Sequence, residues 1–143
     1  MPLLTRCYIK SAFLYLAAAL FLGVVLALGA VTQLPVWLAY LSPAFFHLIM
    51  VGWVTQMIFG VIFWMFPIVT RAQPRGNEAL SWAAYILLNA GLLLRVVCEP
   101  LNSIQRESIW GWGLVLSAIF QWLAAVIFVF YAWPRVKERY RGE

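Results

Sequence analysis

Charged residues are scarce in this chain of 143 residues, of which only 10% are Asp, Glu, Lys or Arg. An ordinary soluble domain carries roughly 25% charged residues. The hydrophobic share is 65% and the mean hydropathy is +0.90. This balance excludes a large soluble domain. It predicts an all-α integral membrane protein, with room for about four helical spans of roughly 20 residues each.

The chain also lacks the residue sets that most enzymes need. It has one histidine, no glycine-rich phosphate loop and no CxxCH pattern, so a covalently attached c-type haem is not indicated. Its five acidic residues are glutamates that we expect at or beyond helix ends, which leaves no carboxylate pair inside the membrane for catalysis or ion-coupled transport. A mononuclear zinc or copper site would need more histidine, cysteine or carboxylate ligands than one histidine supplies. Catalysis by this chain alone is not expected.

Charges and turn residues divide the apolar sequence into four runs, which predict a single transmembrane domain over residues 1–143. The predicted spans are 11–31, 44–69, 79–98 and 109–133, followed by a basic tail over 134–143. The third run is expected to stop at Glu99 and Pro100. All connections are short, so we expect consecutive helices to be neighbours in an antiparallel four-helix bundle.

Basic residues gather on one side of this four-span arrangement. The residues on that side are Arg6, Lys10, Arg71, Arg75, Arg135, Lys137, Arg139 and Arg141. The opposite side has Arg106 in a connection and Arg95 just inside the third span. The positive-inside rule therefore predicts cytoplasmic termini, in a bacterial-type inner (plasma) membrane. Topology and anionic lipid head groups account for the formal charge of +5, so no nucleic-acid partner is expected.

The single histidine, His47, lies near the start of the second apolar run. An ionisable side chain inside hydrocarbon is costly and usually functional, so one interpretation is a ligand for haem iron. The other is an imidazole that hydrogen-bonds a neighbour or reaches head-group water at the membrane edge. Arg95 is expected at a similar depth on the third span, where it would hold a haem propionate. Alternatively, Arg95 snorkels outward and pairs with Glu99 one turn away.

Six-coordinate haem would need a second axial ligand, which this chain does not obviously supply. Met50, Met57 and Met65 lie on the same helix as His47 and cannot reach the opposite face of a haem that it binds. The second ligand would come from another subunit, or from His47 of a second copy in a symmetric dimer. A five-coordinate (bacterio)chlorophyll needs only one imidazole, so a pigment-binding role also stays open.

A second face of the same helix carries small and polar residues. Gly52, Gln56 and Gly60 cluster roughly opposite His47 when the sequence is wound at 100° per residue. Small residues at four-residue spacing let another helix approach closely, and Gln56 can hydrogen-bond across that contact. We interpret the face as a helix-packing surface, with clearance for a flat macrocycle as the alternative.

Four segments carry a family resemblance. They are His47 with residues 52–55 (GWVT), residues 57–61 (MIFGV), residues 66–67 (FP) and residues 88–95 (LNAGLLLR). The stretch resembles the subunit I-like membrane proteins of the haem-copper oxidase superfamily, in the cbb3-type subunit I-like and NnrS-like branch, truncated to four helices. The resemblance implies haem b with His47 as an axial ligand, and electron transfer. The full fold has further histidines, for a second haem ligand, an active-site haem and copper, that this chain lacks.

The sequence therefore predicts a small integral membrane subunit of a respiratory or photosynthetic electron-transfer complex that carries b-type haem on His47. The expected partners are other membrane subunits of a redox complex or a second copy of this chain, with lipid around them and quinone as a candidate ligand. One alternative is a cofactor-free structural or assembly subunit that docks partner helices on its Gly52, Gln56 and Gly60 face. The other is a pigment-binding subunit that uses His47.

Overall fold

The computed structural model describes residues 1–33, 35–67, 76–105 and 107–136. Within these ranges the regular elements are all helical. Four helices are long and apolar enough to cross a membrane, namely Leu3–Leu28, Val36–Met65, Glu78–Ile104 and Ser108–Arg135. The predicted all-α class and the four apolar helices are confirmed by this length and composition. Arg71, Arg75, Arg106, Lys137, Arg139 and Arg141 lie outside the described residues.

The second helix is built from four pieces, whereas the others are more regular. It comprises η1 (Val36–Leu41), α2 (Ser42–His47), η2 (Leu48–Thr55) and α3 (Gln56–Met65), of which η1 is a 3₁₀-helix and η2 a π-helix. The other three helices are α1 (Leu3–Leu28), α4 (Glu78–Ile104) and α5 (Ser108–Ala132), and the 3₁₀ turn η3 (Trp133–Arg135) continues α5. The second helix therefore changes its pitch three times, and His47 stands at one of the changes.

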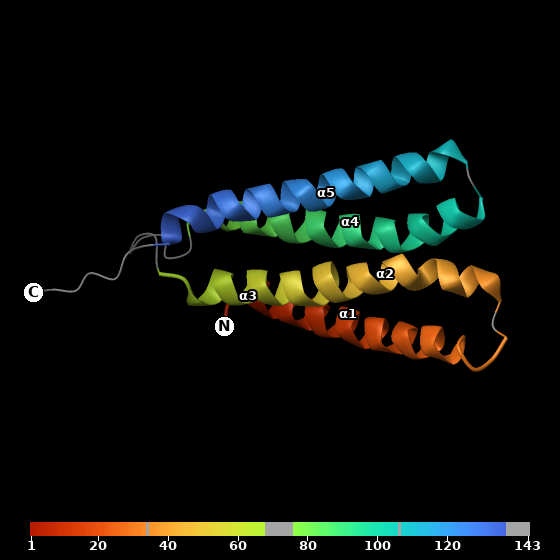
Figure 1. Ribbon diagram of the computed structural model, residues 1–143. Coiled ribbons are helices and arrows are strands. Elements are labelled where there is room, and N and C mark those ends of the chain that lie inside the picture. Colours follow the sequence, from red (N-terminus) through yellow and green to blue (C-terminus); the bar gives the residue numbers. More distant parts are fainter. Residues whose placement is uncertain (34, 68–75, 106, 137–143) are drawn as a thin grey trace, which may run out of the picture.

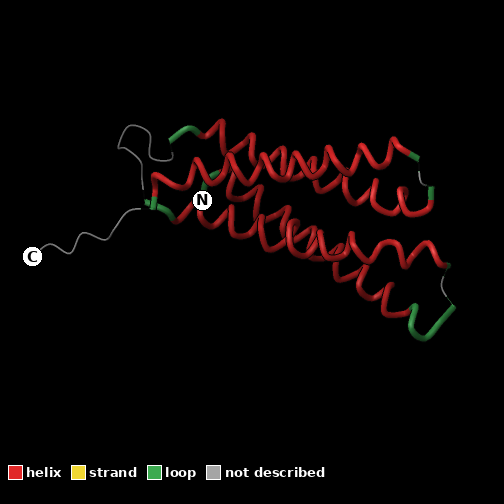
Figure 2. The backbone as a smooth tube through the Cα atoms, turned by 45° about the horizontal axis from the view of Figure 1, so that its top comes forward, coloured by secondary structure: helices red, strands yellow, loops and turns green. Residues whose placement is uncertain are grey.

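The four helices form two hairpins that lie side by side (Figure 1). In one hairpin α1 packs against η2 and α3, and in the other α4 packs along α5; α4 also contacts α2 and η2, which joins the hairpins. The start of α1 and the end of α5 lie at the same end of the molecule, which we call the termini end. At the opposite end, which we call the His47 end, α4 stays in contact with η1 and α2. Figure 2 shows the same four helices in a view turned by 45°.

All four helices extend beyond the predicted spans at one end or both, and the second, predicted over 44–69, runs from Val36 to Met65. α1 begins at Leu3 and includes Arg6 and Lys10, because a helix can continue past charged residues whose long side chains reach water. α4 continues through Pro100 to Ile104, so the expectation that this run stops at Glu99 and Pro100 is wrong for the helix. Proline removes one backbone donor, so the carbonyl of Val96, four residues before Pro100, loses its helical partner while the helix continues.

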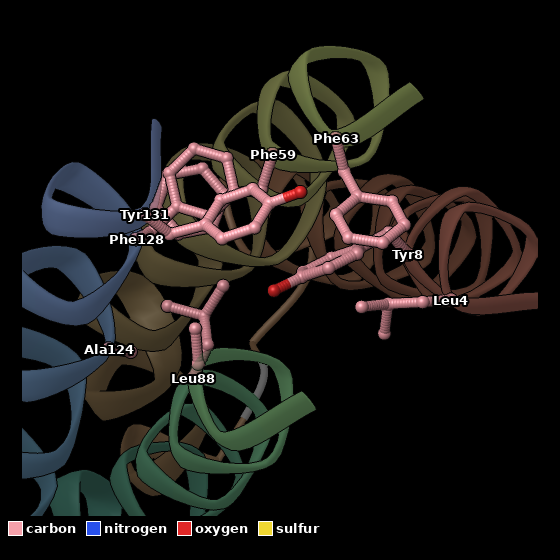
Figure 3. Packing of buried hydrophobic residues seen from close by; sticks show 9 residues of the cluster. Leu4, Tyr8, Phe59, Phe63, Leu88, Ala124, Phe128 and Tyr131 are labelled. Atoms are coloured by element: carbon pink, nitrogen blue, oxygen red, sulfur yellow. The ribbon is translucent and has the colours of Figure 1, made fainter. Parts of the chain in front are cut away.

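Aromatic rings from three of the four helices fill the core at the termini end (Figure 3). The buried cluster comprises Leu4, Tyr8, Phe59, Phe63, Ala84, Leu88, Ala124, Phe128 and Tyr131. Phe59 of α3 and Phe128 of α5 stack with their ring centroids 3.7 Å apart and their planes 4° apart. Phe63 and Tyr131 form a second stacked pair between the same helices, with centroids 5.7 Å apart. These two ring pairs join the two hairpins at the termini end.

Arg135 is buried at the termini end, although the sequence pattern assigned it to an exposed basic tail. Only 2% of it is exposed. Its guanidinium donates to the backbone carbonyls of Phe63 at 3.3 Å, Phe66 at 2.8 Å and Pro67 at 3.1 Å, and to the Tyr131 hydroxyl. The last carbonyls of a helix have no partner inside it and carry partial negative charge. Arg135, which follows α5, therefore supplies hydrogen-bond donors to the carbonyls at the end of α3.

Candidate functional site

His47 is the last residue of α2 and its imidazole turns back toward the start of that helix. Nδ1 lies 2.9 Å from the backbone carbonyl oxygen of Pro43, four residues earlier. A carbonyl oxygen only accepts hydrogen bonds, so the Nδ1 atom carries the proton and donates it. In a neutral imidazole the other nitrogen, Nε2, is then left with a lone pair that can bind a metal. The hydrogen bond to the backbone thus fixes the tautomer in which Nε2 carries the lone pair.

α4 brings Arg95 and Glu99 to the same place. His47 Nδ1 lies 3.7 Å from Glu99 Oε2, and Arg95 Nε lies 3.7 Å from Glu99 Oε1. The exposed fractions of the three side chains are 26% for His47, 24% for Arg95 and 14% for Glu99. The two predicted site residues therefore lie close together, and the carboxylate between them was expected only as a partner of Arg95.

The position of Glu99 bears on the role expected of Arg95. Of the two alternatives that the sequence left open, the geometry favours the pairing of Arg95 with Glu99 over the binding of a haem propionate. A propionate at Arg95 would bring a second carboxylate next to Glu99, and like charges at short distance repel in a poorly solvated site. Arg95 Nε and Glu99 Oε2 are buried atoms for which the described part of the chain provides no hydrogen bond.

A π-helix begins directly after His47 and contains Gly52. η2 runs from Leu48 to Thr55, and the Thr55 hydroxyl donates to the carbonyl of Met50, five residues back, at 2.7 Å. Segments of π-helix are rare, usually short, and frequent at functional sites. Nothing in the sequence signalled this element, because its residues are as apolar as those of the flanking α-helices.

The glycine face of the second helix is covered by the chain's own helices. A Cβ atom added to Gly52 would lie 2.8 Å from Tyr15 Cβ and 3.0 Å from Leu92 Cδ2, and one added to Gly60 would lie 2.8 Å from Tyr8 Cβ. Real side chains do not approach so closely, so these glycines allow α1 and α4 to pack here. A flat macrocycle or a partner helix would have to displace α1 to reach this face.

Next to Gly52, five side chains from three helices form a hydrogen-bonded group inside the bundle, which we call the polar seam: Ser11, Tyr15, Gln56, Tyr85 and Asn89. Gln56 is fully buried, and its Nε2 donates to Asn89 Oδ1 at 3.1 Å. Tyr15 donates to the same oxygen at 2.9 Å, and the hydroxyls of Ser11 and Tyr85 lie 2.7 Å apart. No member carries a carboxylate, amine or imidazole. The seam therefore links helices and does not provide an ion-binding site.

Additional metal ligands are not gathered around His47. The described residues contain no group of three or more His, Cys, Asp or Glu that is arranged to hold a metal ion. Cys98, on the neighbouring turn of α4, is buried with its sulfur against Gly113 of α5. Within the part of the chain that the structure describes, His47 therefore belongs to no such group.

Comparisons with protein-family models, with curated proteins and with solved structures find no match to this chain. The resemblance to the haem-copper oxidase superfamily therefore remains a prediction that depends on the quoted segments alone.

Proposed function

We propose that this chain is a small integral membrane subunit of an electron-transfer complex that holds a b-type haem through Nε2 of His47. One observation carries the proposal: the hydrogen bond of 2.9 Å from Nδ1 to the Pro43 carbonyl. Histidines that bind metals characteristically donate their other ring N–H to a carbonyl or carboxylate, which fixes the tautomer and the ring orientation. The family resemblance supplies the choice of haem among the metals that an imidazole binds.

A haem bound by His47 would lie on the outer surface of the bundle, because the hollow at this end does not reach His47. The hollow of about 500 Å³ at this end is lined by residues 26, 29, 35, 36, 38, 39 and 42, and His47 and Arg95 are not among them. A haem would supply one-electron transfer when bound. The task of this chain is to hold and orient the imidazole, while a partner subunit covers the other face and supplies any sixth ligand.

The proposed topology is an antiparallel bundle with both termini in the cytoplasm of a bacterial-type cell. It is supported by the position of Arg6 and Lys10 in the first turns of α1, at the termini end, together with the positive-inside rule. In this topology His47 lies toward the outer face of the inner membrane. Electrons would then pass between the membrane and a redox partner on the outer side, with quinone as a candidate donor or acceptor.

A cofactor-free structural subunit is the second candidate, and the internal packing of the bundle favours it. It is supported by the polar seam, whose side chains on α1, α3 and α4 pair with one another, and by the glycine face, which α1 and α4 cover. Large aromatic side chains on α5 point outward, among them Trp112, Trp122 and Phe130, and these would contact lipid or partner helices. A pigment-binding subunit would use the same Nε2 atom of His47.

A reduced-minus-oxidised absorption spectrum of the complex purified from its native membrane distinguishes these candidates. The proposal predicts b-type haem bands in the wild type that disappear in His47→Ala. Met50→Leu is the matched control, since Met50 is an exposed potential ligand one turn away on the same helix, and its bands should persist. Haem bands that survive in His47→Ala contradict the proposal. Intact assembly without any chromophore favours the structural candidate, and far-red absorption lost in His47→Ala favours the pigment candidate.

A further inference from the structure

We propose that Glu99 is a positioning residue for His47, whose carboxylate orients the imidazole from the other hairpin and sets how strongly Nε2 donates to a bound iron. The inference rests on the proposed function for its redox consequence. It rests on geometry alone for the orientation of the ring.

Glu99 lies between the guanidinium of Arg95 and the imidazole of His47. Its Oε1 faces Arg95 Nε and its Oε2 faces His47 Nδ1, each at 3.7 Å. These separations are those of ion pairs and exceed a normal hydrogen bond of about 2.9 Å. Oε2 is a buried atom with no hydrogen bond from any described residue. Oε1 is paired with Arg95, so Oε2 is the oxygen through which the carboxylate acts on the Nδ1–H group.

The two groups near Nδ1 come from different parts of the molecule. Pro43 belongs to the same helix as His47, so its carbonyl fixes the imidazole relative to α2 only. Glu99 belongs to α4, in the other hairpin, so its carboxylate fixes the same ring relative to the rest of the bundle. The imidazole is therefore contacted from both hairpins.

The sign of the electronic effect follows from the charges. A carboxylate beside the Nδ1–H group increases the basicity of the metal-bound nitrogen. Negative charge close to the iron also stabilises the oxidised form, which carries one more positive charge, and this lowers the midpoint potential. Arg95 opposes the effect from the other side of Glu99. Removing Glu99 should therefore raise the midpoint potential, and removing Arg95 should lower it.

The first test is a potentiometric titration of the haem in the purified complex. We expect a higher midpoint in Glu99→Gln and a lower one in Arg95→Gln than in the wild type. Glu107→Gln is the control, because it removes the same charge from an exposed position at the start of α5, and its midpoint should equal that of the wild type. Equal midpoints in all four proteins overturn the inference, as do shifts of the same sign in Glu99→Gln and Arg95→Gln.

The second test needs no haem and uses the single histidine of the chain. The full-length protein labelled with ¹⁵N-histidine gives one imidazole, whose two nitrogen shifts report the tautomer. We expect the proton on Nδ1 in the wild type and a larger share of the Nε2–H form in Glu99→Gln. An unchanged tautomer ratio overturns the positioning role. A wild-type complex without haem overturns the proposed function and leaves this readout valid, so the two failures are distinguishable.

Discussion

The two ends of the bundle differ in how their charged side chains are paired. At the termini end, stacked rings fill the core, and Arg135, the one buried charged residue among those that the structure describes there, is surrounded by acceptors at hydrogen-bonding distance. At the His47 end, three ionisable side chains meet at 3.7 Å and two of their buried atoms have no hydrogen bond within the described part of the chain. The charged groups of the two ends therefore differ in how completely they are hydrogen-bonded, although the buried hydroxyls of Thr5 and Ser81 at the termini end also lack a hydrogen bond within the described residues. We expect the termini end to be the stable one and the His47 end to be the reactive one.

The polar seam lies between these two ends and belongs to the stable region. Its side chains are paired with one another, and Gly52 and Gly60 let α1 approach the second helix beside them. Mutations at the termini end and in the seam should therefore lower the free energy of unfolding. Mutations of His47, Arg95 or Glu99 should change the binding or the midpoint potential of the proposed haem and leave the free energy of unfolding nearly unchanged.

The largest loss of stability is expected for Arg135→Gln. Removing the guanidinium leaves the Phe63, Phe66 and Pro67 carbonyls without their donor in a buried site, which should cost about 3 kcal/mol of unfolding free energy. Reversible unfolding in mixed micelles measures it. Arg6→Gln, at an exposed position of α1, is the control and should change the unfolding free energy by less than about 0.5 kcal/mol. If Arg135→Gln and Arg6→Gln have equal unfolding free energies, Arg135 does not stabilise the end of α3.

Gly52→Ala is expected to have the next largest effect. The new Cβ would lie 2.8 Å from Tyr15 Cβ, so α1 must shift, at a cost of about 2 kcal/mol. Gly111→Ala on α5 is the matched control, because the nearest atom to its Cβ is 3.9 Å away, and this variant should be neutral or slightly stabilising. The same unfolding experiment compares them. A neutral Gly52→Ala would mean that α1 does not pack on η2 this closely.

A smaller effect is expected for the pair at the centre of the seam. Gln56→Leu and Asn89→Leu each remove the reciprocal amide hydrogen bonds between α3 and α4. A double-mutant cycle should give a coupling energy of about 0.6 to 1.7 kcal/mol, as for hydrogen bonds between membrane helices elsewhere. Additive losses in the double variant would contradict the pairing.

Glu99→Gln should have the smallest effect on folding. The carboxylate makes two ion pairs at 3.7 Å on a partly exposed cluster, and such pairs contribute about 0.5 kcal/mol. If this substitution lowers the unfolding free energy as much as Arg135→Gln does, the division between a stable end and a reactive end fails.

The helices could be predicted from the sequence because a membrane helix needs only a long apolar run. The ends of those helices were harder: Arg6, Lys10 and Pro100 look like boundaries, yet α1 and α4 continue through them. Charge patterns locate the water boundary of a span, whereas the helix itself ends only where its backbone loses its partners.

The candidate site could be predicted in part. His47 and Arg95 were identified because ionisable residues are rare in apolar helices. Glu99 was expected at a helix end and proved to lie inside α4 against both of them, which required knowledge of helix register and neighbours. The burial of Arg135 and the π-helix η2 depend on tertiary contacts and backbone geometry that no spacing rule encodes.

The most direct test of this account is the amount of non-covalent haem that co-purifies with the full-length protein, extracted and quantified for the wild type and for His47→Ala prepared side by side. We expect haem in the wild type and its loss in His47→Ala, while the unfolding free energy of the two proteins stays equal. Haem retained by His47→Ala at the wild-type level would contradict the central claim that this one imidazole holds the iron.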